Sequence, residues 1–220
     1  MDWGAVWLSL KLASCTTLVL CLLGLPLAGW LVASRWRWKF LVEAVVALPL
    51  VLPPTVLGFY VLVALGPDSP LGRAWESLTG RLLPFSFPGL LVASVLYSLP
   101  FAVRPFTVAF AAVDRRLVEA SWCLGVSRFG TFFRVVVPLS WTGILTGIIL
   151  TFAHTLGEFG VVLMVGGNIP GQTRTVSISI YDDVQALNYD AAGRTALFLL
   201  ACSFTALALT YALQRRPGVP

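Results

Sequence analysis

The sequence predicts an all-α protein that spans a membrane. Of its 220 residues, 58% are hydrophobic and 11% are charged, whereas soluble domains average roughly 25% charged residues. So few charges cannot cover a water-facing surface, and the chain must therefore present apolar side chains to lipid. The apolar residues form continuous runs rather than the alternating segments of a membrane β-barrel, which favours helices. We expect a single transmembrane domain over residues 1–220.

Five apolar runs are each long enough to cross a bilayer, which takes about 20 helical residues. The stretch MDWGAVW before the first run lacks the basic region of a signal peptide, so we expect that run to remain as an uncleaved helix. Two long loops on the outer side are each expected to hold one short helix. The predicted spans are residues 8–33, 40–65, 88–113, 139–165 and 193–214, and the predicted outer loops are 66–87 and 166–192.

Basic residues set the orientation, because Lys and Arg concentrate in cytoplasmic loops. They are more frequent after the first, third and fifth spans than after the second and fourth, so the N-terminus is predicted outside and the C-terminus inside a cell (inner) membrane. This explains the net charge of +5 without a nucleic-acid partner. The cytoplasmic set is Arg35, Arg37, Lys39, Arg115, Arg116, Arg128, Arg134, Arg215 and Arg216, and the outer set is Arg73, Arg81, Arg174 and Arg194.

The sequence contains no catalytic or metal-binding pattern. Cys15, Cys21, Cys123 and Cys202 form no CxxC pair, so neither a disulfide nor a metal site is expected. The single histidine, His154, lies inside the fourth predicted span. Without a P-loop, the chain cannot bind and hydrolyse a nucleotide by that route. We therefore expect a transport subunit without a cofactor of its own, driven by an ion gradient or by another polypeptide.

A polar stretch from Glu119 to Pro138, EASWCLGVSRFGTFFRVVVP, separates the third and fourth spans. Its pattern is E-A-S, three residues, G, nine residues, V, one residue and V-P. This resembles the EAA loop of binding-protein-dependent ABC importer permeases, with conservative departures at Ser121, Val135 and Val137. In that family, the first helix of the loop sits in a groove of the ATPase subunit. The resemblance therefore implies that ATPase coupling runs through Glu119, Ala120, Ser121, Gly125 and Arg128.

The local chemistry of this loop, about residues 114–138, suits a docking element. Glu119 near a helix start would complement the helix dipole, and Gly125 can end that helix or allow a close approach. The alternative is a plain re-entry loop between two spans.

Three more segments narrow the resemblance. Residues 48–58 read LPLVLPPTVLG, residues 156–160 read LGEFG and residues 167–175 read GNIPGQTRT. Together they look like the molybdate importer permeases, close kin of the sulfate and thiosulfate permeases. LGEFG is shared by both branches, and the NIPGxTRT pattern points to the molybdate branch. The resemblance covers nearly the whole chain and implies the five core helices of the type I ABC importer permease fold.

The resemblance also implies an assembly and an activity. The expected partners are a second copy of the chain in a homodimer, two cytoplasmic ATP-binding subunits that hold ATP and Mg, a periplasmic or extracellular molybdate-binding protein, and the lipid bilayer. The expected activity is translocation of molybdate by alternating access, with tungstate tolerated because of its similar size and charge. The rival hypotheses are a sulfate or thiosulfate permease, a secondary transporter or channel acting alone, and a membrane-embedded enzyme.

Residues inside the spans supply candidates for the translocation path or gate. Pro53 and Pro54, with Pro49, remove backbone donors and should kink the second span. Such a kink is tolerated in lipid where neighbouring helices or a cavity satisfy the freed carbonyl groups. Arg104 lies in the third span and either lines the inner half of an anion path or extends its long side chain to the interface.

The outer end of the fourth span and the loop after it supply the other candidates. Glu158 would repel a dianion, so we expect it to cap a helix, to pair with Arg174 or Arg194, or to hold a kink at neighbouring glycines. His154 is expected to serve helix packing. The donor-rich loop suits an oxyanion or a binding protein, and the alternative is an ordinary turn-rich loop. The candidate path or gate residues are Pro53, Pro54, Arg104, Glu158, Asn168, Thr173 and Arg174.

Overall fold

The computed structural model describes residues 1–214, which form helices and no strands. Arg215 and Arg216, placed on the cytoplasmic side above, lie outside the described residues. The elements in chain order are α1 (Trp3–Ala33), α2 (Lys39–Ala47), the 3₁₀ turn η1 (Leu48–Leu50), α3 (Pro54–Leu65), α4 (Pro70–Thr79), α5 (Phe87–Ala111), α6 (Arg115–Cys123), α7 (Arg128–Thr131), the π-helical turn η2 (Phe132–Val136), α8 (Val137–Leu139), α9 (Trp141–Leu156), α10 (Gly160–Gly166), α11 (Val176–Gln185) and α12 (Tyr189–Gln214).

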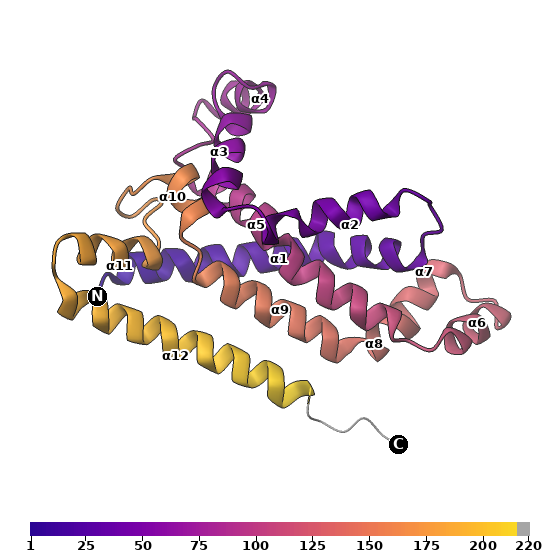
Figure 1. Ribbon diagram of the computed structural model, residues 1–220. Coiled ribbons are helices and arrows are strands. Elements are labelled where there is room, and N and C mark those ends of the chain that lie inside the picture. Colours follow the sequence, from indigo (N-terminus) through magenta and orange to yellow (C-terminus); the bar gives the residue numbers. More distant parts are fainter. Residues whose placement is uncertain (215–220) are drawn as a thin grey trace.

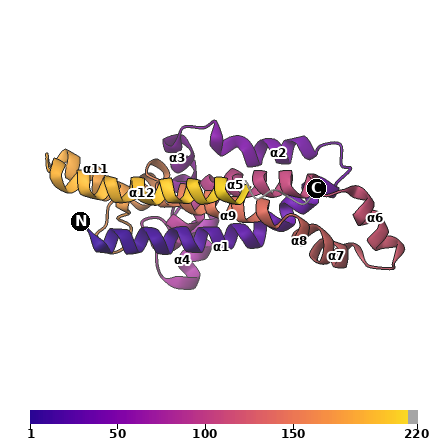
Figure 2. The same ribbon diagram turned by 90° about the horizontal axis from the view of Figure 1, so that it is seen from below.

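Three helices, α1, α5 and α12, are each long and apolar enough to cross a membrane alone, and two bent helix pairs bring the number of spans to as many as 5. The bent pairs are residues 39–65 and residues 128–156. The long helices run side by side, with the N-terminus and α11 at one end and α6 and α7 at the other (Figures 1 and 2). The all-helical fold is confirmed for the described residues, with three spans, or up to five if each bent pair forms one span.

The centre of the bundle is formed by α1, α5 and α9, and small residues let them approach one another. Phe106 is fully buried, and Gly24 of α1 and Gly147 of α9 both lie against its ring. Ala28 and Ala102 are also buried in this cluster. In lipid, apolar side chains gain little from leaving their surroundings, so close backbone approach and van der Waals packing hold such helices together.

The second predicted span is interrupted at its prolines, as the sequence analysis expected. The chain bends by 112° between α2–η1 and α3. Pro53 has φ −53° and ψ 137°, the extended conformation that a following proline imposes. In Figure 1, α3 therefore leaves the bundle and carries α4 away from it.

The fourth predicted span is also interrupted, at Gly157–Phe159 between α9 and α10. The two interruptions meet, because α10 packs on α3. A Cβ added to Gly160 would lie 2.7 Å from the Cβ of Pro54, and one added to Gly58 would lie 2.7 Å from the Cβ of Met164. Only glycine allows the two broken spans to come this close.

The two short helices expected in the outer loops are present as α4 and α11. The helical spacing of Val176, Ile180, Val184 and Leu187 predicts the second of these helices. Val176 is buried, whereas Val184 and Leu187 are exposed, and Leu187 follows the end of α11. The Ser9 hydroxyl accepts a hydrogen bond of 2.8 Å from the Val176 backbone N–H. This contact fixes the start of α11 against α1, and its other end turns back toward α12.

We predict that Gly147→Ala destabilises the bundle by about 1–3 kcal/mol, because the new methyl group overpacks a closed core. Its Cβ would lie 2.5 Å from the buried Phe106 ring. The matched control is Gly193→Ala in α12, where a Cβ meets nothing within 4 Å. Thermal unfolding in detergent should show a lower Tm for Gly147→Ala alone; equal Tm values for the two variants would contradict the packing described here.

Candidate functional site

One candidate region is the α6–α7 hairpin at the end of the molecule opposite the N-terminus. The Asp114 side chain accepts a hydrogen bond of 2.9 Å from the Arg116 N–H and starts α6. Glu119 therefore lies a full turn inside the helix rather than near its start, and it pairs with Arg115 at 2.8 Å. Gly125 ends the helical segment with φ +79° and leaves open space around its Cα.

A buried hydrogen bond holds the two helices of this hairpin together. The hydroxyl groups of Ser121 and Thr131 lie 3.0 Å apart, and both side chains are buried. Ser127 begins α7 by accepting a hydrogen bond of 3.1 Å from the Gly130 N–H. The Arg128 guanidinium lies 5.8 Å from the centroid of the Trp122 ring, across the same hairpin. These contacts hold the side chains at the centre of the hairpin in place.

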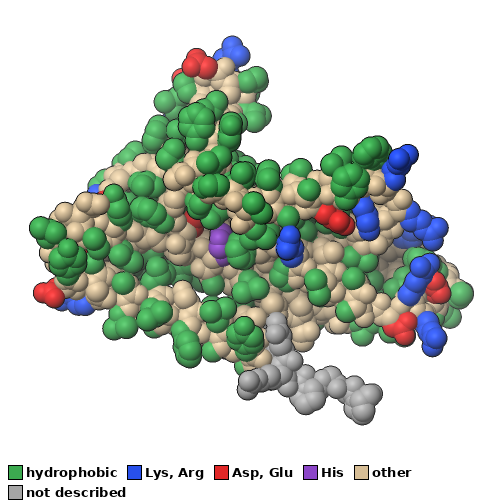
Figure 3. Space-filling view, viewed as in Figure 1, with side chains coloured by type: hydrophobic (Ala, Val, Ile, Leu, Met, Phe, Trp, Pro, Cys, Tyr) green, Lys and Arg blue, Asp and Glu red, His purple; other side chains and the backbone are tan. Residues whose placement is uncertain are grey.

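The solvent-facing side of the hairpin is apolar, although a surface exposed to the cytoplasm would normally be polar. We define the α6–α7 surface as Leu117, Trp122, Leu124, Phe129 and Phe133, all of them exposed. Leu124 is 84% exposed and Phe129 is 76% exposed. Lys and Arg side chains gather at this end of the molecule (Figure 3), which fits the cytoplasmic side. Several large apolar side chains exposed among charged ones are typical of a protein-interaction site.

The other candidate region surrounds α10. A buried carboxyl group lies just before the first residue of this helix. Glu158 is only 4% exposed, and neither carboxyl oxygen has a hydrogen-bond partner among the described residues. The Ser94 side chain on α5 faces this carboxyl group. Pairing with Arg174 or Arg194, one of the roles expected for Glu158, does not occur among the described residues, and Arg174 pairs with Asp182 instead. Burying an unpartnered carboxyl group inside a membrane span destabilises the protein. Such a residue is therefore a candidate for a functional role.

More polar side chains line α5 next to this interruption. The Ser98 hydroxyl lies 3.1 Å from Nδ1 of His154 and 2.9 Å from the hydroxyl of Thr155. The His154 ring stacks on Phe101, with ring centroids 3.7 Å apart. These contacts agree with the packing role expected for His154. Ser94 and Ser98 were not singled out in the sequence, because a serine in an apolar run gives no signal of what it faces.

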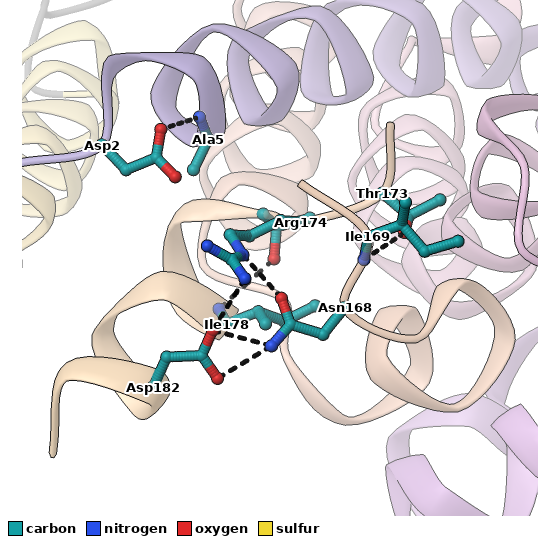
Figure 4. A network of polar contacts seen from close by, with 9 residues as sticks. Asp2, Ala5, Asn168, Ile169, Thr173, Arg174, Ile178 and Asp182 are labelled. Carbon is teal, nitrogen blue, oxygen red and sulfur yellow. Dashed lines mark hydrogen bonds and ion pairs between the residues drawn. The ribbon is translucent and has the colours of Figure 1, made fainter. Parts of the chain in front are cut away.

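The loop after α10 is closed by a network of polar contacts (Figure 4). The Asn168 amide nitrogen donates to both carboxyl oxygens of Asp182, at 2.8 and 2.7 Å. Nε of Arg174 donates to Oδ1 of Asn168 at 2.6 Å, and its guanidinium lies 3.5 Å from the Asp182 carboxyl group. The buried Thr173 hydroxyl donates to the Gly166 carbonyl at 2.7 Å. The donors of this loop are therefore directed at the protein itself.

The structure brings several of the predicted path residues to the two ends of α10. Pro54 and Glu158 lie at the meeting point of the two interruptions, while Asn168, Thr173 and Arg174 form the network at the other end of this short helix. Arg104 lies apart from them. It is exposed on α5 and makes no ion pair among the described residues. Pro53 is exposed beside Pro54.

Sequence comparison gives consistent matches over the chain. Residues 22–217 match the family model described as "Binding-protein-dependent transport system inner membrane component". The chain is 51% identical to the molybdenum transport system permease protein ModB of Azotobacter vinelandii, over 97% of this chain and 95% of the relative. It is 35% identical to ModB of Escherichia coli K12, over 97% and 94%. A probable sulfate transport system permease, cysT of Marchantia polymorpha, is 32% identical over 93% of this chain and 70% of its own length.

Structural comparison agrees on the fold. A chain in the crystal structure of a bacterial ABC transporter involved in the import of alginate superposes with a TM-score of 0.77, at 17% identity, over 98% of this chain and 79% of that chain. At that identity the likeness shows the arrangement of helices alone. The helices described above are thus those of a type I ABC importer permease.

We predict that Asp182→Ala loosens the loop at residues 167–175, because Asn168 and Arg174 lose their shared acceptor. The ion pair is partly exposed, so its loss should speed hydrogen exchange at the amides of Gln172–Arg174 only a few-fold. The neighbouring Asp183→Ala serves as control, since the Asp183 side chain makes no such contact among the described residues. Equal exchange in the two variants would count against the network.

Proposed function

The chain belongs to the family of binding-protein-dependent transport system inner membrane components, and from that premise we propose that it is the membrane-spanning permease of an ATP-driven molybdate importer. The observation that supports molybdate as the substrate is the sequence identity with a molybdenum transport permease, which extends over nearly the full length of both chains. Tungstate, of similar size and charge, would be carried as well. Sulfate is less well supported, because the sulfate relative shares a smaller part of the sequence.

The proposed assembly is a homodimer with two cytoplasmic ATP-binding subunits and a molybdate-binding protein on the outer side. ATP and Mg would be held by the ATP-binding subunits, so this chain would need no cofactor. Its exposed apolar surfaces support such partners. The α6–α7 surface would contact the ATP-binding subunit. Phe59 and Tyr60 are exposed on α3, which extends away from the bundle (Figure 1), and a second copy of the chain would cover them.

The proposed coupling runs from Glu119, Ala120, Ser121, Gly125 and Arg128 into the membrane through η2 and α8. The Ser140 hydroxyl between α8 and α9 donates a hydrogen bond of 3.1 Å to the Ala109 carbonyl of α5. The chain bends by 76° here. Motion of the hairpin would therefore reach α9 and α5 together and, through α9, the interruption before α10. This provides a route for alternating access driven by a partner.

The proposed gate is the contact between α3 and α10, with Pro53, Pro54 and Glu158 at its inner end. The loop that follows α10 is held in place by Asn168, Thr173 and Arg174. These residues would therefore fix the outer end of the gate rather than bind the anion directly. Arg104, alone and exposed on α5, would face an anion passing along that helix. Helices interrupted inside the bilayer are the segments that transporters commonly use as gates and sites.

Uptake by the reconstituted complex tests the proposed substrate. We expect ATP-dependent uptake of radiolabelled molybdate. Excess tungstate should inhibit this uptake, whereas sulfate at the same excess concentration should hardly reduce it. Sulfate uptake equal to or stronger than molybdate uptake would overturn the assignment of molybdate as the substrate. Recovery of the chain alone, with proton- or sodium-driven uptake that needs no ATP, would favour a secondary transporter instead.

We predict that Gly125→Asp weakens docking of the ATP-binding subunit by at least about tenfold, because it places an unpaired charge beside the α6–α7 surface. Gly125 has φ +79°, so any side chain also adds strain. The control is Gly125→Asn, which is isosteric, uncharged and better tolerated at positive φ. Co-purification and molybdate-stimulated ATP hydrolysis are the measurements. Unchanged assembly and hydrolysis in the Asp variant would count against the coupling assignment.

A further inference from the structure

A cavity of about 710 Å³ opens at the outer end of the molecule, between α1, α4, the start of α5 and the loop after α10. Two basic side chains line it, Lys11 from α1 and Arg81 from the segment between α4 and α5. Its other walls include Trp75, Phe87 and Gln172. This cavity is separate from the α3–α10 contact and from the α6–α7 surface, and no function proposed above uses it.

The charge of this cavity is unbalanced. No Asp or Glu lines it, and neither Lys11 nor Arg81 belongs to an ion pair among residues 1–214. The Lys11 ammonium instead lies 4.4 Å from the centroid of the Phe87 ring, a contact that holds the cation at the cavity wall. Outer loops of membrane proteins are normally poor in Lys and Arg. Two such side chains in one cavity, without a carboxylate partner, therefore favour the binding of an anion.

The position of the cavity along the membrane normal identifies the kind of anion. Lys11 lies eight residues after the first residue of α1, Trp3, or about 12 Å along the helix axis. It is level with Phe87, the first residue of the transmembrane helix α5. Trp3 and Trp7 are exposed on the same outer stretch of α1, as in the aromatic belt at a bilayer surface. The cavity thus lies near the outer boundary of the bilayer, where long basic side chains that start inside a span reach the outer-leaflet headgroups.

We propose that this cavity binds the phosphate group of an anionic lipid headgroup in the outer leaflet, held between Lys11 and Arg81. A phosphodiester is a permanent anion with free oxygen acceptors, which suits an ammonium and a guanidinium group together. Leu82 and Phe87 give the cavity an apolar wall against which the glycerol end of the lipid can pack. A bound lipid would tie α1 and α5 to the segment that follows α4. This proposal does not depend on which solute is transported.

The test compares lipid retention by variants of the full chain, purified in its natural assembly and reconstituted in nanodiscs that contain phosphatidylglycerol and phosphatidylcholine. We expect native mass spectrometry to show phosphatidylglycerol retained by the natural protein. Lys11→Met/Arg81→Met keeps most of the side-chain length, and it should retain about 25-fold less, because each of the two basic groups near an anionic headgroup contributes about a factor of five. Lys11→Arg should keep the lipid.

Arg73→Met is the matched control, because Arg73 lies on α4 and does not line the cavity. Equal phosphatidylglycerol retention in this control and in the double variant would overturn the proposal. Each single variant, with an expected loss of about fivefold, keeps the test valid if the double variant does not fold. Displacement of the lipid by millimolar inorganic phosphate would show that the cavity takes a soluble oxyanion, and would overturn the lipid as its source.

Discussion

Inside a bilayer, a helix can be interrupted only where the backbone groups set free find partners within the protein, and this constraint organises the whole chain. Local turns satisfy part of the need. The Leu52 N–H donates to the Leu48 carbonyl at 3.1 Å, and the Gly157 N–H donates to the Ala153 carbonyl at 3.3 Å. The remaining shelter comes from packing the two interrupted spans against each other at Gly160 and Gly58. The helices α1 and α5 continue through their internal prolines, Pro26, Pro100 and Pro105, without an interruption of this kind.

The same constraint divides the molecule into stiff and deformable parts. Glycines pressed against Phe106 and Ala109 lock α9 to α5, so these two helices behave as one rod. Deformable points lie at its ends: the π-helical turn η2 with the bend at Ser140 on one side, and the interruption before α10 on the other. In the proposed coupling, a displacement at η2 would reach the interruption before α10 along this pair of helices. The buried carboxyl group of Glu158 lies at the far hinge, where a change of packing would be felt first.

Sequence reasoning captured what depends on local chemistry. Hydrophobic runs indicated a helical membrane protein, and Pro53 and Pro54 marked an interruption that the structure contains. The orientation set by Lys and Arg stays a prediction. It failed where the outcome depends on which segments meet. The spacing of Val176, Ile180, Val184 and Leu187 predicts the helix α11, but it does not say where the helix packs; the hydrogen bond from the Val176 N–H to Ser9, far away in the chain, fixes its start against α1. Pairing of Arg174 with Asp182, and hence the isolation of Glu158, likewise depends on tertiary contacts that no local pattern encodes.

The exposed leucine and phenylalanine side chains of the α6–α7 surface also bear on the life of the chain in the cell. Before its partner arrives, a newly inserted copy displays Leu124 and Phe129 to the cytosol, and exposed apolar surface is what chaperones and degradative proteases recognise. If the α6–α7 surface serves assembly as proposed, the same residues would mark surplus copies for removal. Turnover of the orphan chain would then keep the subunits in balance without matched synthesis.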